Sequence, residues 1–334
     1  MKVVIDMPVS DKFIRQLKTI PHLELVLIDK PAETERLLPS NIIRDCNLFF
    51  TTFLPLNHTE MTELKFVQIS SSGYKQLCGK QLPERNVIAC NALGVFDVPI
   101  AEWSISMMIN LTRDIKKLLH NQDAAIWERS SRFQNEIRGK VVGIWGYGGI
   151  GRETARLAKA FGMQVHILTR AGISARANTY VVSGTGDILG NYPDKVFTEE
   201  AKEEFLRGID FLILAMPHTR DTEGIIGEKE LKLLNHDAFI LNPARGPLIH
   251  EHALLKALTE NWIAGAALDT HYYYPMPDDH PLWKMPNVIM TPHISGSSAN
   301  PKFLDRVWEI FVINVKNFIE GKPVLNQLHQ ESLK

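Results

Sequence analysis

The glycine-rich segment at 146–151, Gly-Tyr-Gly-Gly-Ile-Gly, constrains the fold of this chain more than any other feature. It follows the apolar run 141–145, which predicts a strand, and it opens a predicted helix. Between a strand and a helix, this glycine spacing is typical of a turn that holds a dinucleotide pyrophosphate. Gly146 permits the tight turn, Gly148 lets the backbone approach the anion, and Gly151 lets helix and strand pack closely. The helix N-terminus adds unpaired N–H groups and the positive end of a dipole.

Short apolar segments alternate with helix-length segments along the whole chain, which predicts an α/β fold with parallel sheets. The predicted strands lie at 3–5, 23–28, 48–50, 66–69, 87–89, 141–145, 165–168, 211–214, 239–241, 263–268 and 288–290. The predicted helices include 100–119, 149–161 and 301–319. The first of these contains no proline or glycine, so we expect one continuous helix there.

The end of the strand at 165–168 indicates which dinucleotide is preferred. Thr169 and Arg170 follow it, and no acidic residue occurs between Glu153 and Asp187. An acid here would accept hydrogen bonds from the ribose hydroxyls of NAD and repel a 2′-phosphate, whereas a hydroxyl and a guanidinium would bind that phosphate. We therefore predict that NADP(H) is the preferred cofactor and that NAD(H) is possible. In the alternative, Arg170 stacks on the adenine and NAD binds.

Residues 171–196 form an unusually long connection between a strand and a helix. The segment is rich in Gly, Ser, Thr and Asn. Its residues 179–186 could form a β-hairpin. The alternative is a mobile surface insertion.

The charge balance disfavours several classes of protein. With 37 Lys and Arg against 38 Asp and Glu, the formal net charge is -1, so no general attraction to nucleic acid or to an anionic membrane is expected. The apolar runs are too short to cross a bilayer, and the first six residues contain an acid where a signal peptide needs apolar residues. The three cysteines form no metal-type pair. We expect a cytoplasmic protein without a metal site.

Three further segments complete a pattern. They are Asn242-Pro-Ala-Arg-Gly246, Ala267-Leu-Asp269 and Met290-Thr-Pro-His-Ile-Ser-Gly296. Together with the glycine-rich turn, their order and spacing resemble the D-isomer-specific 2-hydroxyacid dehydrogenases. The resemblance implies two Rossmann-like domains, with the cofactor domain inserted into the substrate domain and the active site in the cleft between them. It also implies a homodimer formed through the cofactor domain.

The resemblance further implies domain limits and residue roles. The substrate domain would comprise 1–100 and 297–334, and the dinucleotide-binding domain 101–296. Arg245 matches the arginine that grips the substrate carboxylate and carbonyl, a task that suits a permanently charged, bidentate fork. His293 matches the acid/base histidine, since imidazole titrates near neutrality. The loop that binds the substrate carboxylate through backbone N–H groups is matched by Ser72, Gly73 and Tyr74. The predicted cofactor contacts, from the turn and from the resemblance, are Gly146, Gly148, Gly149, Ile150, Gly151, Thr169, Arg170, Met216, Pro217, Pro243, Asp269 and Gly296.

One catalytic position departs from the family pattern. The family's third catalytic residue is a Glu five positions after the Asp that Asp269 matches, and Tyr274 stands there. A carboxylate beside His293 would raise the pKa of the imidazole, whereas a neutral phenol can only orient the ring. We therefore predict that Tyr274 is the third catalytic residue, that the pKa of His293 is lower than in relatives with the Glu, and that carbonyl reduction is best at lower pH. In the alternative, Tyr274 points elsewhere and Asp278, Asp279 or a water takes the role.

The expected activity is hydride transfer between NADP(H) and a 2-oxo acid or D-2-hydroxy acid. The substrate could be small, like glyoxylate or hydroxypyruvate, or bulky and aromatic. A pocket for a bulky substrate would be lined by Phe53, Leu54, Tyr74 and 272–274. A formate dehydrogenase-like oxidoreductase is one alternative, because formate enzymes also lack the Glu and share much of the tail motif at 290–296. Another is a dinucleotide-sensing, corepressor-like binding protein, against which the retained arginine and histidine argue.

Overall fold

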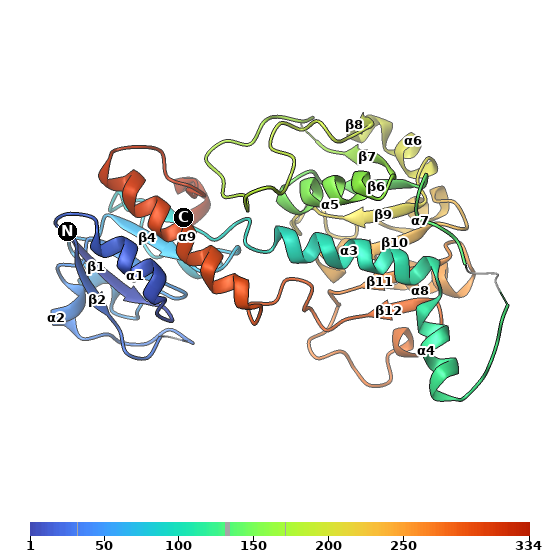
Figure 1. Ribbon diagram of the computed structural model, residues 1–334, viewed down its shortest axis with the longest axis horizontal. Helices are drawn as coiled ribbons and strands as arrows, with labels where there is room; N and C mark the ends of the chain where they lie inside the picture. Colours follow the sequence, from blue (N-terminus) through green and yellow to red (C-terminus); the bar gives the residue numbers. More distant parts are fainter. Residues whose placement is uncertain (32, 131–133, 171) are drawn as a thin grey trace. The chain divides into compact units, whose positions relative to one another are not determined.

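A computed structural model of the protein describes residues 1–31, 33–130, 134–170 and 172–334 (Figure 1). The chain forms two compact units, each built around one parallel sheet. Unit 1 comprises Met1–Val95, Arg176–Val182 and Ser298–Lys334, and unit 2 comprises Phe96–Ala175 and Ser183–Ser297. The prediction of an α/β fold with parallel sheets is confirmed.

Unit 1 contains a five-stranded sheet flanked by helices. Its elements are β1 (Lys2–Asp6), α1 (Asp11–Lys18), β2 (Glu24–Leu27), α2 (Ser40–Ile43), β3 (Leu48–Thr51), β4 (Phe66–Ile69), β5 (Ile88–Cys90) and α9 (Pro301–Ile319). The strand order is β2-β1-β3-β4-β5. The ring of Phe50 in β3 lies 5.0 Å from Trp308 and 4.2 Å from Phe311, both in α9. Residues from both ends of the chain therefore share one core.

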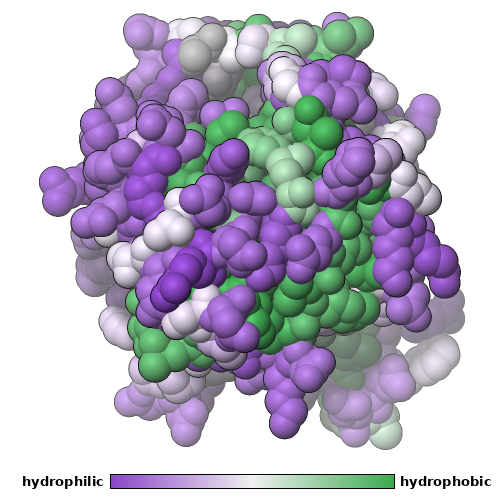
Figure 2. Space-filling view, turned by 90° about the vertical axis from the view of Figure 1, so that its left-hand side faces the viewer, coloured by the Kyte–Doolittle hydropathy of each residue, from purple (hydrophilic) through white to green (hydrophobic). Residues whose placement is uncertain are grey.

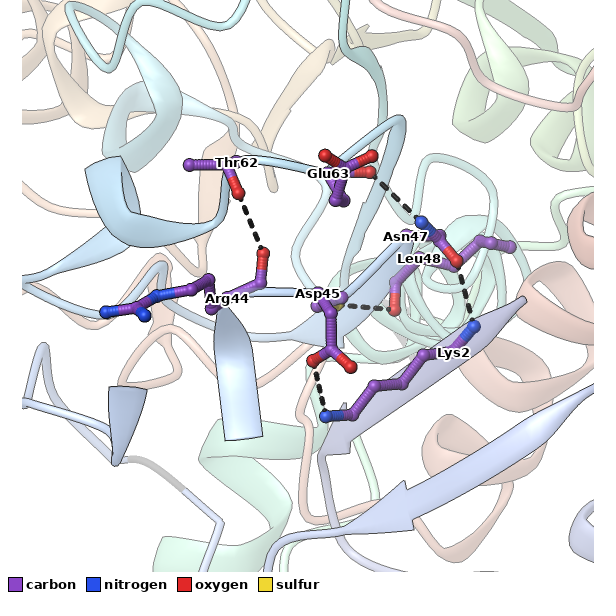
Figure 3. Close-up of polar contacts among 8 residues, drawn as sticks. Lys2, Arg44, Asp45, Asn47, Leu48, Thr62 and Glu63 are labelled. Atoms are coloured by element: carbon purple, nitrogen blue, oxygen red, sulfur yellow. Dashed lines mark hydrogen bonds and ion pairs between the residues drawn. The ribbon is translucent and has the colours of Figure 1, made fainter. Parts of the chain in front are cut away.

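Polar contacts hold the start of β3 in register (Figure 3). The side chain of Asn47 accepts from the backbone N–H of Lys2 at 2.9 Å and donates to the carbonyl of Glu63 at 3.3 Å. The Nζ of Lys2 lies 2.7 Å from Oδ1 of Asp45. These contacts connect the residue before β3 to β1 and to the loop that precedes β4.

Unit 2 contains a seven-stranded sheet of order β12-β11-β10-β9-β6-β7-β8. Its elements are α3 (Asp97–Thr112), α4 (Ile115–Asp123), β6 (Val141–Trp145), α5 (Gly149–Ala160), β7 (Gln164–Leu168), β8 (Lys195–Phe197), α6 (Lys202–Arg207), β9 (Phe211–Leu214), α7 (Glu228–Leu233), β10 (Phe239–Asn242), α8 (Glu251–Thr259), β11 (Gly265–Leu268) and β12 (Val288–Met290). Side chains from α3 and α5 form one apolar cluster with the sheet, and side chains from α6, α7 and α8 form another. Because both faces are buried, the central strands β6 and β9 contain no polar side chains other than the tryptophan at the end of β6.

The prediction of one continuous helix at 100–119 is wrong. The helix ends after Thr112, and α4 begins at Ile115 with a new direction (Figure 1). Asp114 between them has a φ of 48°, in the left-handed region. Asp tolerates this conformation better than most residues other than glycine, so a break needs neither proline nor glycine.

The hairpin prediction for 179–186 is also wrong, and residue 171 lies outside the described residues. The described part of the insertion, 172–194, contains no strand, and β8 begins only at Lys195. Polar contacts fasten this loop instead. Arg152 donates to the carbonyl of Ser174 at 2.6 Å, and the hydroxyl of Tyr180 donates to Oε2 of Glu309 at 2.6 Å.

The surface of unit 1 is mixed in character. Figure 2 shows apolar side chains reaching the surface between hydrophilic ones on this side of the molecule. Exposed large apolar residues of unit 1 include Val9, Leu27, Leu37 and Leu56. Scattered apolar side chains of this kind are ordinary on a folded protein and indicate no binding site by themselves.

Candidate active site

The glycine-rich turn between β6 and α5 has the geometry that a pyrophosphate site needs. Gly146 has a φ of 102°, and a Cβ there would lie 2.7 Å from the carbonyl oxygen of Ala215. A Cβ on Gly151 would collide with the carbonyl oxygen of Gly146. A Cβ on Gly148 would meet nothing within 4 Å. Close backbone packing thus requires glycine at positions 146 and 151. Gly148 leaves open space where an anion can approach the start of α5. The turn therefore fits the pyrophosphate of a dinucleotide.

The end of β7 presents a hydroxyl and a guanidinium. Thr169 is half-buried and Arg170 is exposed. The next acid along the chain, Asp187, accepts from the hydroxyl of Tyr147 at 2.6 Å and from the N–H groups of Gly190, Asn191 and Tyr192. Burial alone would raise the pKa of Asp187, but these hydrogen bonds outweigh it and lower the pKa. The carboxylate is therefore engaged within the loop that contains it.

Asp269 anchors the loop that carries His293. Its buried carboxylate accepts from the hydroxyl of Thr291 at 2.6 Å, from the N–H of Ile294 at 2.9 Å, and from both the N–H and the hydroxyl of Ser295. The N–H of His293 donates to the carbonyl of Asp269 at 2.8 Å. Two carboxylate oxygens accept about four hydrogen bonds, so this loop already uses the capacity of the side chain.

Tyr274 reaches the ring of His293. Its hydroxyl lies 3.1 Å from Nδ1 of His293. The same hydroxyl oxygen accepts the backbone N–H of His271 at 3.2 Å, while Nε2 of His271 lies 2.8 Å from the carbonyl of Thr291. Because the phenol oxygen accepts from a fixed donor, its own proton is available for Nδ1. Position 274 thus places a hydroxyl group against the imidazole.

Burial lowers the pKa of His293, and the positive charge of Arg245 lowers it further. The negative charge of Asp269 acts in the opposite direction but does not outweigh them. Arg245 is exposed, and the turn that carries it is fixed by Asn242, whose side chain accepts from the N–H of Arg245 at 3.2 Å and donates to its carbonyl at 2.8 Å. The cationic fork and the imidazole of unit 2 are therefore electrostatic neighbours.

The remaining predicted cofactor residues follow the carboxyl ends of strands in unit 2 or flank α5. Met216 and Pro217 come after β9, and Pro243 comes after β10. Ile150 belongs to the first turn of α5. Gly296 lies beyond β12, where a Cβ would lie 3.0 Å from Ile100. The carboxyl ends of parallel strands are where ligands bind in open α/β sheets.

The predicted carboxylate loop, Ser72, Gly73 and Tyr74, follows β4 in unit 1. The carbonyl of Ser72 accepts from the side chain of Asn91 at 2.7 Å. Gly73 is exposed, and a Cβ there would meet nothing within 4 Å. The side chain of Asn91 therefore holds the loop in place, and the backbone at Gly73 is accessible to a ligand.

Several residues suggested for a bulky-substrate pocket make contacts within their own unit. Leu54 is fully buried in the core of unit 1. Tyr272 packs against an apolar cluster of unit 2, and the hydroxyl of Tyr273 donates to Glu251 at 3.1 Å. Of the three consecutive tyrosines, Tyr274 alone lies on the imidazole. Sequence periodicity cannot separate such neighbours, because they belong to an irregular loop.

Within the described ranges, no group of three or more His, Cys, Asp or Glu side chains could hold a metal ion. No helix in that part of the chain combines the length and apolar character needed to span a bilayer.

Comparison with known proteins agrees with this geometry. The family profile described as "D-isomer specific 2-hydroxyacid dehydrogenase, NAD binding domain" matches residues 105–295. The glyoxylate reductase of Korarchaeum cryptofilum is 27% identical over 331 residues, which cover 94% of this chain and 92% of the relative. The D-3-phosphoglycerate dehydrogenase of Bacillus subtilis is 31% identical over 270 residues, 81% of this chain and 48% of the relative. A solved D-isomer specific 2-hydroxyacid dehydrogenase family protein from Aeromonas salmonicida is 25% identical with a TM-score of 0.75, covering 98% of this chain and 99% of that one.

Proposed function

The chain belongs to the D-isomer-specific 2-hydroxyacid dehydrogenase family, an NAD(P)-dependent oxidoreductase family, and from that premise we propose that it is an NADP(H)-preferring reductase that converts a 2-oxo acid to a D-2-hydroxy acid. The observation that carries the proposal is the imidazole of His293, hydrogen-bonded to Tyr274 and close enough to Arg245 for the guanidinium to lower its pKa. A proton donor within the electrostatic reach of a permanent cation suits a carbonyl that is flanked by a carboxylate.

In this proposal Arg245 binds the substrate carboxylate and polarises the carbonyl oxygen. The bound nicotinamide supplies the hydride. His293 in its imidazolium form donates the proton that the developing alkoxide needs, and in the reverse direction the neutral ring accepts it. Tyr274 holds the ring by Nδ1, which leaves Nε2 for the substrate. Asp269 supports the ring indirectly, because its carboxylate accepts four hydrogen bonds from the loop that carries His293.

We further propose the substrate domain as 1–100 with 297–334 and the dinucleotide domain as 101–296. The N–H groups at Ser72, Gly73 and Tyr74 would bind the substrate carboxylate in this assignment. Asp269 would hydrogen-bond the nicotinamide carboxamide only by giving up or sharing one of its loop contacts. Its anchoring of the His293 loop is the role that the contacts support best.

The preference for NADP(H) rests on Thr169 and Arg170. The hydroxyl and the guanidinium follow β7 where an NAD-preferring site would carry an acid, and Asp187 is engaged elsewhere. Replacing Thr169 by Asp while changing Arg170 to Ala should move the preference toward NADH, because a carboxylate repels the 2′-phosphate and the cation that binds it is gone.

The decisive experiment is steady-state turnover of a panel of 2-oxo acids, including glyoxylate and hydroxypyruvate, with NADH and with NADPH. We expect reduction of at least one 2-oxo acid with a higher kcat/KM for NADPH. A higher kcat/KM for NADH would refute the cofactor preference alone. Turnover of formate without oxo-acid reduction would support a formate dehydrogenase-like activity, and dinucleotide binding without any turnover would support a sensor.

A further inference from the structure

The carboxylate of Asp97 lies against the first residue of α5. Asp97 is the first residue of α3 and is only 8% exposed. A Cβ added to Gly149 would collide with this carboxylate, and its distance to Oδ1 would be 2.6 Å. Gly149 has an ordinary negative φ, so the backbone does not require glycine there. The carboxylate of another helix instead fills the space beside Gly149.

The start of α5 has a particular need for negative charge. Its N-cap is Gly148, which has no side chain to accept a hydrogen bond, and its first turn contains no acidic residue. A helix N-terminus of this kind is stabilised by an anion placed at its end. The carboxylate of Asp97, on a helix that packs against α5, places a negative charge beside this helix start. The pyrophosphate of a dinucleotide is bound through the same N–H groups and the same dipole.

We propose that Asp97 limits the affinity of this protein for dinucleotides by placing a carboxylate at the N-terminus of α5, where the pyrophosphate would bind. The carboxylate stabilises the start of α5 when no cofactor is bound. A pyrophosphate that binds there either displaces the carboxylate or lies close to it, and like charges at such a distance repel. The effect concerns the pyrophosphate that NADH and NADPH share, so it is independent of the 2′-phosphate and of Arg170. The inference rests on the dinucleotide site of the proposed function and makes no use of the proposed substrate.

The test compares the wild type with Asp97→Asn, which keeps the shape of the side chain and removes its charge. Equilibrium titration should show that the variant binds NADPH, NADH and ADP-ribose at least about fivefold more tightly. Adenosine, which has no phosphate, should bind the two proteins equally. Without ligand the variant should melt about 1–3 °C lower, because the start of α5 has lost its anion. Lower stability combined with tighter binding is a signature that a merely structural role would not produce.

Glu102→Gln is the matched control, since it removes one negative charge from an exposed position of the same helix. It should change neither the affinities nor the melting temperature. Unchanged or weaker binding of ADP-ribose by folded Asp97→Asn would overturn the proposal. If that variant does not fold, Asp97→Ser, which retains a short acceptor for the helix end, is measured in its place against the same criterion. A wild type that binds no dinucleotide would instead contradict the proposed function.

Discussion

At the scale of single residues, Tyr274 is the side chain that hydrogen-bonds to Nδ1 of His293, the proposed acid/base. The phenol oxygen accepts the N–H of His271 and lies 3.1 Å from Nδ1 of His293. If the phenol donates its proton to Nδ1, the neutral ring carries its own proton on Nε2. A carboxylate at this position would do the opposite, because it accepts a proton from Nδ1 and stabilises the imidazolium. With Tyr274 at this position, no carboxylate stabilises the imidazolium through Nδ1.

Replacing Tyr274 by Glu should raise the pKa of His293 by about one unit, because the carboxylate stabilises the imidazolium. Reduction consumes the imidazolium form, so kcat/KM for reduction falls as pH rises through this pKa, and in the variant the fall should occur about one pH unit higher. The pH–rate profile and the NMR titration of His293 measure the shift. Tyr273→Phe is the control, since its hydroxyl bonds to Glu251 rather than to the imidazole. An identical profile for Tyr274→Glu would contradict this account.

The family resemblance points to the proposed catalytic residues, but it does not indicate how each is held. Arg245, His293 and Tyr274 are predicted because they match positions of the family motifs. The contacts that hold them could not be predicted in this way, since Thr291 and Ser295 bond to Asp269 only after two strands have been brought together. Hydroxyl residues next to a histidine are too common in loops to carry a signal by themselves.

At the scale of elements, the buried strands are the most predictable part of the fold. Strands such as β6 and β9 are buried on both faces, so apolar character runs through every residue and marks them in the sequence. β8 was not predicted, since two of its three residues are exposed at the edge of the sheet. The break at Asp114 was missed because a left-handed Asp has no sequence signature comparable to proline or glycine.

The insertion illustrates the same limit, and its anchor can be tested. The Tyr180 hydroxyl donates to Glu309, and the backbone N–H of Tyr180 donates to the side chain of Asn326 at 3.1 Å. Tyr180→Phe removes the bond to the charged partner, which typically contributes about 1.5–3 kcal/mol. Hydrogen exchange near Tyr180 should then accelerate by about tenfold or more, while the amides of β6 remain unchanged. Thr179→Val, which loses only a contact to Ala177, is the control. Equal exchange in both variants would show that the tyrosine is no anchor.

At the scale of the whole molecule, we propose that unit 2 mediates a homodimer, as the family resemblance implies. Large apolar side chains are exposed along α4 and just after it. They are Leu118, Leu119, Ile126 and Trp127, exposed by 41%, 56%, 52% and 90%. Such a concentration of exposed apolar surface within a few turns is costly unless another chain covers it.

Changing Trp127 to Glu should convert the dimer to a monomer, because a charge would be buried in the interface without a partner. Light scattering on the eluting protein measures the mass. Leu56→Glu places the same charge on an exposed apolar position of unit 1 and should leave the dimer intact. A wild type that elutes as a monomer, or a Trp127 variant that remains dimeric, would contradict the assignment of this interface.

The segment Arg176–Val182 has a consequence for modular exchange. It makes the chain pass between the two units at four points rather than two: after Val95, after Ala175, after Val182 and after Ser297. Consider a chimaera in which residues 96–297 of this chain replace the matching segment of a relative. This segment would still contain Tyr180. That tyrosine would then need a counterpart of Glu309 in foreign sequence. A functional chimaera therefore has to take the loop 176–182 and α9 from the same parent protein, because the two segments are joined by the bond between Tyr180 and Glu309.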